Sequence, residues 1–193
     1  LILGGVMYNA YLSAKYGFEI NGIDEEELKD AGKFVENVSK HPQKLIEMPH
    51  IIESDTMEGK IEGKYRVRNI KDIEKGTKLN YVLDIAKQSF EDETVRKAFH
   101  NARTIFVNAV MGLAPHFNEG TIALNEIIHK NENARKLYGG GDTLQEMKNL
   151  APNIHKKAVD DPNYYLFTGG GAVLKAIQEG TPFGIEPVDK LRD

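Results

Sequence analysis

The sequence predicts an α/β protein: a three-layer, Rossmann-like, doubly wound and mostly parallel sheet with a small β-hairpin at its periphery. Short apolar runs of strand length alternate with amphipathic segments of helix length, which is typical of parallel strands joined by helices. Three of the apolar runs lead into glycines and then into a helical segment, at residues 4–5, 139–141 and 169–171. Such turns lie at the carboxyl ends of parallel strands, where open α/β sheets bind ligands.

The composition limits the class of protein. The chain has 193 residues, of which 40% are hydrophobic and 28% charged, and this suits one soluble domain with a sizeable core. A formal net charge of -4 argues against a nucleic-acid partner, and no apolar run is long enough to span a bilayer. The absence of cysteine excludes disulfides and thiolate metal sites. We therefore expect a cytoplasmic protein with neither nucleic acid nor membrane as a partner.

The N-terminal half is predicted to alternate helices with short strands. Apolar residues recur at helical spacing after the first glycine pair, and Gly17 suits a helix end. Asp24, followed by three glutamates, is typical of a capped helix start. We expect a strand over residues 1–3, followed by helices over 6–15 and 24–39. After them we expect a strand over 44–48 and, beyond Pro49, an edge strand over 50–54. A hairpin is expected over 58–69.

The C-terminal half is predicted to repeat the strand-and-helix pattern more regularly. We expect strands over residues 81–85, 104–107 and 164–168, and one that ends at Tyr138. Helices are expected over 92–102, from Asn118 to about 130, from the glycines to 150, and over 171–179, where Gly180 stops the last one. Residues 152–160 read as a polar connection. Because the chain begins inside an apparent buried strand, we expect it to be a single-domain fragment, residues 1–193, of a longer protein.

The segment around Gly139–Gly141 carries the strongest signal of chemistry. Its glycines allow a ligand to approach the backbone closely, and Asp142 and Thr143 are residue types that cap helices, with Glu146 placed for a capping box. The free N–H groups of a first helical turn attract anions, and an Asp beside a phosphate can hold magnesium. The alternative is a tight strand-to-helix turn in which Asp142 only caps the helix.

Other chemistries are excluded by what the chain lacks. The six histidines have no zinc-ligand spacing within one element, and no serine lies in a G-x-S-x-G elbow. The glycine turns match neither a Walker A loop nor G-x-G-x-x-G. What remains is a set of backbone amides, glycines, one Asn and one Asp, which suits binding and polarising phosphates. Phosphoryl transfer fits this set, because its catalysis is mainly positioning and charge stabilisation.

The two triple-glycine motifs, Gly139-Gly-Gly-Asp-Thr143 and Thr168-Gly-Gly-Gly-Ala172, resemble the nucleotide-binding C-terminal domain of phosphoglycerate kinase. Leu1-Ile-Leu-Gly-Gly5, Leu83-Asp-Ile85, Thr104–Asn108, Met111-Gly112 and Phe117–Thr121 follow in the order of that family. The resemblance implies a monomeric glycolytic and gluconeogenic kinase that transfers a phosphoryl group between 1,3-bisphosphoglycerate and ADP, with Mg-ATP or Mg-ADP as nucleotide. It also implies that an N-terminal domain outside this chain binds 3-phosphoglycerate, so the chain alone is expected to be inactive.

By the same resemblance, the site consists of glycines, one Asn and the start of a helix. The residues expected to bind the nucleotide are Gly4 and Gly5 near the adenine, then Asn108, Gly112, Gly140, Gly141, Asp142 and Thr143, with Asp142 also holding the magnesium ion. The residues expected to act in catalysis are Gly169, Gly170 and Gly171, which would place a helix N-terminus at the transferred phosphoryl group.

The sequence departs from the family at the strand end that carries Asn108. The family has Asn-Gly-Pro where this chain has Asn108-Ala-Val110, and the glutamate that holds the ribose is missing from the segment Gly112–His116. Two alternatives follow from these departures. One is a nucleotide-binding module that has lost kinase activity. The other is a domain whose glycine turns bind a different phosphorylated metabolite, with Ala109, Val110 and His116 reshaping the pocket.

Overall fold

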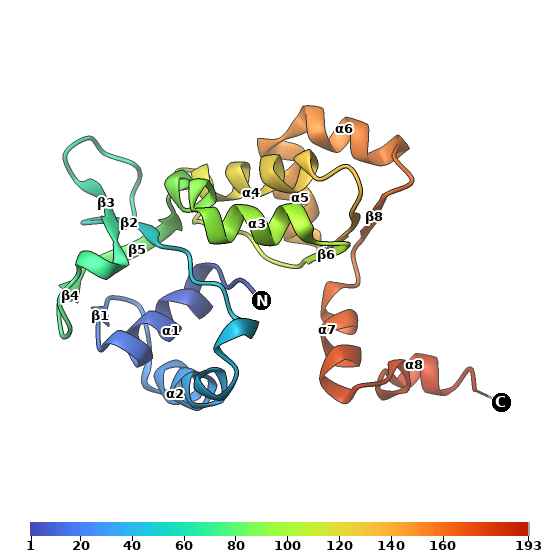
Figure 1. Ribbon diagram of the computed structural model, residues 1–193, viewed down its shortest axis with the longest axis horizontal. Coiled ribbons are helices and arrows are strands. Elements are labelled where there is room, and N and C mark those ends of the chain that lie inside the picture. Colours follow the sequence, from blue (N-terminus) through green and yellow to red (C-terminus); the bar gives the residue numbers. More distant parts are fainter. Residues whose placement is uncertain (193) are drawn as a thin grey trace.

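The structure, a computed structural model, describes residues 1–192 and contains helices packed around three small sheets (Figure 1). The predicted α/β class with parallel strands is confirmed, although the strands are divided among three sheets. Short 3-10 helices connect several elements. Their bounds are Pro42–Lys44, Ile70–Asp72, Lys87–Glu91 and Pro182–Gly184.

The first sheet is parallel and holds the two strands that lead into the triple-glycine turns. Its order is β6 (Thr104–Val107), β7 (Arg135–Gly139) and β8 (Tyr164–Phe167), as predicted to within one or two residues. Helix α4 (Glu119–Lys130) connects β6 to β7, and α5 (Gly141–Leu150) with α6 (Pro152–Asp160) connects β7 to β8. Because all three strands run the same way, their carboxyl ends meet at one edge of the sheet.

The second sheet is antiparallel, in the order β3 (Tyr65–Asn69), β2 (His50–Ser54) and β5 (Tyr81–Ile85). A hairpin is present here, but the prediction that it spans residues 58–69 was wrong: β2 pairs with β3 through a loop over residues 55–64. β2 also lies in the middle of the sheet and not at its edge. Pro49 allows this because it precedes the strand, where its missing N–H costs no ladder bond.

The N-terminal helices cover the antiparallel side of the molecule. Helix α1 (Gly5–Tyr16) packs against α2 (Glu25–Lys40), and two-residue strands β1 (Glu19–Ile20) and β4 (Lys78–Leu79) pair beside them. The predicted start of α2 is confirmed, since Asp24 accepts a hydrogen bond from Glu27 N at 2.7 Å and Asp24 N donates to Glu27 Oε2 at 3.0 Å. Gly17 ends α1 in the left-handed region, as predicted.

Two predicted strands are absent, over residues 1–3 and 44–48. The two segments do lie side by side: the Leu1 amino group donates to Lys44 O at 2.7 Å and Ile46 N donates to Leu1 O at 2.9 Å. Two hydrogen bonds are too few for a strand ladder. Their apolar residues resembled strands in the sequence, although only Leu3, Leu45 and Met48 are buried.

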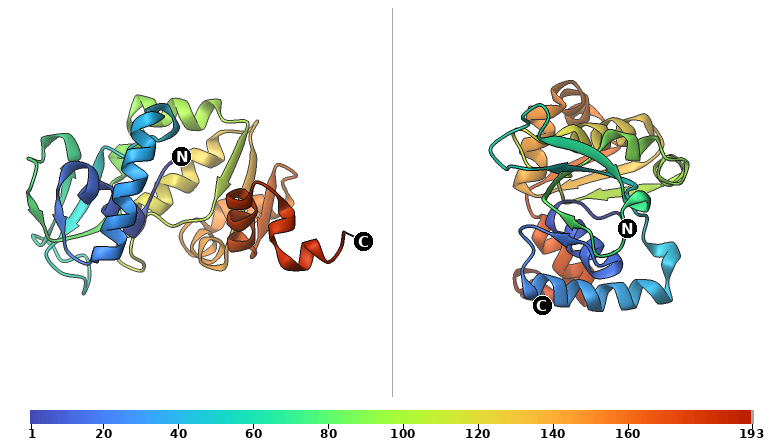
Figure 2. Two further views of the ribbon diagram at one scale, coloured as in Figure 1. Left: turned by 90° about the horizontal axis from the view of Figure 1, so that it is seen from below. Right: turned by 90° about the vertical axis from the view of Figure 1, so that its left-hand side faces the viewer.

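The prediction of a polar connection over residues 152–160 was also wrong, because these residues form α6. Pro152 occupies the first turn of that helix, where a proline needs no N–H acceptor. After β8 the chain forms α7 (Gly170–Glu179) and the short α8 (Glu186–Asp189). Both lie at one end of the molecule, opposite to the β2–β3 hairpin (Figures 1 and 2).

Candidate functional site

The structure brings Asn108 and two of the glycine turns together at the carboxyl edge of the parallel sheet. A Cβ atom on Gly140 would lie 2.8 Å from Asn108 Oδ1, and one on Gly170 would lie 2.0 Å from the same oxygen. Gly139 and Gly170 are themselves in close contact, since a Cβ on Gly139 would be 3.1 Å from Gly170 Cα. The Asn108 amide thus fills the space that a side chain at position 140 or 170 would need.

The first glycine turn, at Gly4 and Gly5, lies against the loop that follows Asn108. A Cβ atom on Gly4 would lie 2.7 Å from Met111 Sδ and 3.1 Å from Val110 O, and one on Gly5 would lie 4.0 Å from Val110 O. Val110 and Met111 come two and three residues after Asn108 in the chain. The start of α1 therefore lies beside the loop that leaves β6.

Other glycines of the predicted site face open space. A Cβ atom on Gly141, Gly169 or Gly171 would meet no atom within 4 Å. Gly141 and its neighbour Asp142 are exposed, whereas Thr143 is buried. The crevice therefore has a packed side, around Asn108, and an open side lined by glycine backbone, where a ligand can approach closely.

Two helices begin at this crevice and a third begins beside the loop that leaves β6, all three without a side-chain cap. Their N-cap residues are Gly4, Gly140 and Gly169, and none provides a hydrogen-bond acceptor to the first turn. Elsewhere α2 and α3 are capped by Asp24 and Asp92, whereas α4, α6 and α8 also start without a side-chain cap. Uncapped N–H groups at the positive ends of α1, α5 and α7 form a favourable environment for an anion.

The expected cap at the start of α5 is not formed. Gly140 is the N-cap, Asp142 and Thr143 lie inside the first turn, and no capping box involves Glu146. The alternative in which Asp142 serves only as a cap is therefore contradicted. The Asp142 carboxylate is exposed at the helix start, next to the uncapped N–H groups.

No group of three His, Cys, Asp or Glu side chains within residues 1–192 could hold a metal ion by itself. Magnesium bound with a nucleotide does not need such a group, since it usually keeps several waters and takes one or two carboxylates plus phosphate oxygens. Asp142 fits this requirement as a single exposed carboxylate beside an anion site.

One residue of the region was not predicted, and it is the buried acid Asp84 at the end of β5. Its carboxylate accepts hydrogen bonds from Ile85 N at 2.8 Å and from Gly120 N at 3.1 Å. Burial, followed by the charge of Glu119, raises the pKa of Asp84 to about 6 despite these bonds. An Asp within the apolar run Tyr81–Ile85 was the signal that could have identified it.

The loop after β6 is held from several sides. Met111 N donates to Thr121 Oγ1 at 2.9 Å, and Leu113 N donates to Leu83 O at 2.8 Å. Gly112, predicted to bind nucleotide, lies against the Asp84 carboxylate, where a Cβ would come within 2.4 Å of Oδ1. An ion pair between Lys60 and Glu119 attaches the β2–β3 loop to the start of α4.

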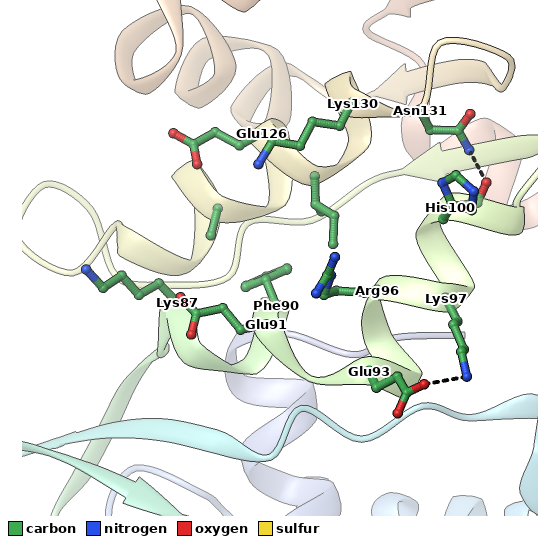
Figure 3. A pocket seen from close by; sticks show the side chains of 12 residues that line it. Lys87, Phe90, Glu91, Glu93, Arg96, Lys97, His100, Glu126, Lys130 and Asn131 are labelled. Atoms are coloured by element: carbon green, nitrogen blue, oxygen red, sulfur yellow. Dashed lines mark hydrogen bonds and ion pairs between the residues drawn. The ribbon is translucent and has the colours of Figure 1, made fainter.

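A separate hollow of about 970 Å³ lies between α3 (Glu93–Asn101) and α4 (Figure 3). Phe90, Ala123 and Ile127 form its apolar part, and basic and acidic side chains alternate around it, including the pair Lys97–Glu93 at 2.6 Å. None of the glycine-turn residues lines it. Its mixed charges indicate a solvated groove between two helices.

Comparison with known proteins gives consistent results. The family model described as phosphoglycerate kinase matches residues 1–180. A phosphoglycerate kinase from Thermus thermophilus is 28% identical over 193 residues, which cover 98% of this chain and 46% of that protein. One from Mycoplasma genitalium is 27% identical over 202 residues, covering 98% of this chain and 44% of that protein.

The fold is also similar to a solved structure. Phosphoglycerate kinase from Coxiella burnetii matches with a TM-score of 0.73 and 28% identity, over 96% of this chain and 45% of that chain. The chain therefore spans less than half the length of the relatives it matches. None of the helices within residues 1–192 has the length and apolar character needed to cross a membrane.

Proposed function

The chain belongs to the phosphoglycerate kinase family, and from that premise we propose that the crevice at the carboxyl ends of β6, β7 and β8 binds Mg-ADP and Mg-ATP. The observation that carries the proposal is the convergence on Asn108 of two glycine turns, each followed by a helix without a side-chain cap. Nucleotide phosphates would supply the acceptors that these helix starts lack.

Each part of the crevice has a role in this proposal. Gly4 and Gly5, beside Val110 and Met111, border the adenine. Asn108 and Gly112 lie along the nucleotide, while Gly140, Gly141 and Thr143 receive its phosphates and Asp142 holds the magnesium ion. Gly169, Gly170 and Gly171 place the start of α7 at the phosphoryl group in transfer.

The chemistry of this chain would be electrostatic. Backbone N–H groups at the starts of α5 and α7 are fixed by the sheet and by Asn108, so they need no rearrangement to stabilise charge on the moving phosphoryl group. In this proposal the side chains of Asp142 and Thr143 serve binding and not nucleophilic attack, which agrees with direct transfer between two bound substrates. The magnesium ion would neutralise charge on the phosphate oxygens.

For the protein as a whole we propose phosphoryl transfer between 1,3-bisphosphoglycerate and ADP, as a cytoplasmic and monomeric enzyme of glycolysis and gluconeogenesis. The names of the relatives support this activity. The acceptor, 3-phosphoglycerate, would bind to residues that the 193-residue chain does not contain. The chain alone should therefore bind nucleotide and fail to turn over 3-phosphoglycerate with ATP.

Calorimetric titration with Mg-ADP tests the proposal. We expect saturable binding that weakens by about tenfold in Asp142→Ala, because one carboxylate ligand of the magnesium ion is lost. Asp160→Ala, which removes an exposed Asp at the end of α6, is the matched control and should bind like the unchanged chain. Equal affinities in all three proteins, or no binding at millimolar nucleotide, would contradict the proposed role of the crevice.

A second candidate is a site for another phosphorylated metabolite. It is favoured by the segment Gly112–His116, which has no carboxylate to hold a ribose. Competition separates the two candidates: sugar phosphates that displace Mg-ADP at lower concentration than ADP itself would support this second function. The lost-activity alternative would be supported if the protein bound Mg-ADP but remained inactive with an intact acceptor site.

A further inference from the structure

Asp84 is a buried carboxylate that the nucleotide chemistry does not use. It lies at the end of β5, is 2% exposed, and accepts its two hydrogen bonds from backbone N–H groups of different elements. Ile85 N belongs to β5 itself, whereas Gly120 N belongs to the first turn of α4, 36 residues later. The side chain therefore joins the antiparallel sheet to the helix that follows the crevice loop.

The packing around Asp84 is built to admit this carboxylate. A Cβ atom on Gly112 would lie 2.4 Å from Asp84 Oδ1, and one on Gly120 would lie 2.5 Å from the same oxygen. Two glycines, one in the crevice loop and one in α4, thus leave the space that the carboxylate fills. Such a fit is expected where a side chain is held in one position between two backbone segments.

Through Asp84, β5 is joined to the start of α4, and the start of α4 in turn holds the loop that borders the crevice. Met111 N donates a hydrogen bond to Thr121 Oγ1 in the first turn of α4. Leu113 N donates a hydrogen bond to the carbonyl of Leu83, the neighbour of Asp84. Val110 and Met111 are in turn the residues that Gly4 contacts. Movement of the α4 start away from β5 would therefore move the crevice loop, residues 110–117.

We infer that Asp84 is a positioning residue, which holds the crevice loop by joining β5 to α4 and makes the opening of this loop sensitive to pH. The inference deepens the proposed function and rests on it, because the loop matters only if the crevice binds a ligand. Asp84 has no contact with the predicted phosphate site and acts through the loop.

The charged groups around Asp84 set the direction of the pH effect. Glu119 faces it from α4 and is itself paired with Lys60 of the β2–β3 loop, while Ile52 of β2 and the loop residues Met111, Gly112 and Phe117 bring no ionisable group. Burial, which comes first, and the charge of Glu119 raise the pKa of Asp84 from 3.8 to about 6. Opening the loop would expose the carboxylate to water, which stabilises its charged form. Ionisation therefore favours opening, and protonation favours the closed loop.

The test is amide hydrogen exchange of residues 111–113 and 120 in the ligand-free chain, expressed as protection relative to intrinsic rates. In the unchanged protein, protection should fall as the pH rises from about 5 to about 7.5, on either side of the raised pKa of Asp84. In Asp84→Asn, which cannot ionise, protection should not change with pH. In Glu119→Gln the fall should move to lower pH, because a neighbouring negative charge has been removed.

A matched pair of alanine variants separates positioning from ordinary capping. Asp84→Ala removes the acceptor of two backbone N–H groups, and Asp92→Ala does the same at the start of α3, where Asp92 accepts from Thr94 N and Val95 N. Only Asp84→Ala should lower the protection of residues 111–113, by about tenfold, and only Asp84→Ala should weaken Mg-ADP binding.

The outcomes are distinct. Loop protection that is independent of pH in the unchanged protein, or unaltered in Asp84→Ala, would overturn the inference. If Mg-ADP binds equally to the unchanged protein and to Asp84→Ala, the link between loop and crevice is refuted. If no variant binds Mg-ADP but the exchange behaves as expected, the proposed function fails while the positioning of the loop by Asp84 stands.

Discussion

At the scale of single residues, the Asn108 amide determines which glycines of the crevice can be replaced. It lies against Gly140 and Gly170, while Gly169 and Gly171 border open space. Gly140 also has a φ of 98°, a conformation that other residues adopt only with strain. Glycine is therefore present in the two motifs for different reasons: Gly140 and Gly170 leave room for Asn108, whereas Gly169 and Gly171 border open space.

This difference predicts that alanine substitutions at two neighbouring glycines affect stability differently. Gly170→Ala should destabilise the fold by about 1–3 kcal/mol, because the new methyl group would overlap Asn108 and force its side chain to move. Gly171→Ala should cause no loss of stability, since alanine is the better helix former and the space is open. Urea unfolding of both variants checks this. Equal losses would mean that Asn108 is not the constraint.

At the scale of elements, the antiparallel sheet is stabilised by a buried glutamate whose carboxylate accepts four hydrogen bonds. Glu53 on β2 accepts from Arg66 at 2.9 and 2.7 Å, from Arg68 at 3.0 Å and from Asn80 N at 3.0 Å. Burial alone would raise the pKa of Glu53, but these hydrogen bonds and the two positive charges outweigh it and lower the pKa. The arginines sit on β3, so Glu53 joins the two strands of the hairpin.

The sign of this shift predicts acid sensitivity of the sheet. Because the folded-state pKa lies below the ordinary value, the stability from Glu53 is present above about pH 4.5 and is lost as the pH falls through the lowered value. Glu53→Gln should lose about 1–3 kcal/mol at neutral pH, and the difference from the unchanged chain should shrink in acid. Glu58→Gln, in the exposed β2–β3 loop, is the control. A difference that stays constant with pH would rule out ionisation as the cause.

The elements that could be predicted from the sequence are those with local signals. Asp24 and Gly17 determine helix ends through hydrogen bonds within a few residues. The strands over residues 1–3 and 44–48 were wrong because a strand depends on neighbours that a local pattern does not reveal. Residues 152–160 were predicted to be a polar connection, although Pro152 suits the first turn of a helix. The role of Asp84 could not be predicted, since Gly120, which bonds to it, is 36 residues away.

At the scale of the whole molecule, stability is distributed unevenly. Helix α7 is mostly exposed, with only Gly170 buried, and Leu174 and Ile177 are 47% and 63% exposed. Helix α4, in contrast, buries five residues between the sheet and its neighbours. Helices with few buried contacts open locally without global unfolding. Beyond its start at Gly170, which lies against Asn108, α7 is thus expected to open more readily than α4.

Hydrogen exchange followed by mass spectrometry should resolve this unevenness. Amides of α7 are expected to exchange at least about tenfold faster than those of α4, because local opening of α7 disturbs little of the core. Mg-ADP should slow exchange at the start of α7 and leave α4 almost unchanged. Similar rates in the two helices of the ligand-free chain would contradict the predicted order.

The starts of α1, α5 and α7, which have no side-chain cap, belong to distant parts of the sequence. Helix α1 begins at Gly5, beside Val110 of the loop that leaves β6, and α7 begins at Gly170, against Asn108 at the end of β6, although the two starts lie near opposite ends of the sequence. A nucleotide that contacts both would close a loop of almost the whole chain, as a non-covalent cross-link in a protein that has no cysteine for a covalent one. At a hundredfold excess over its Kd, such a ligand adds about 2.7 kcal/mol to the free energy of unfolding.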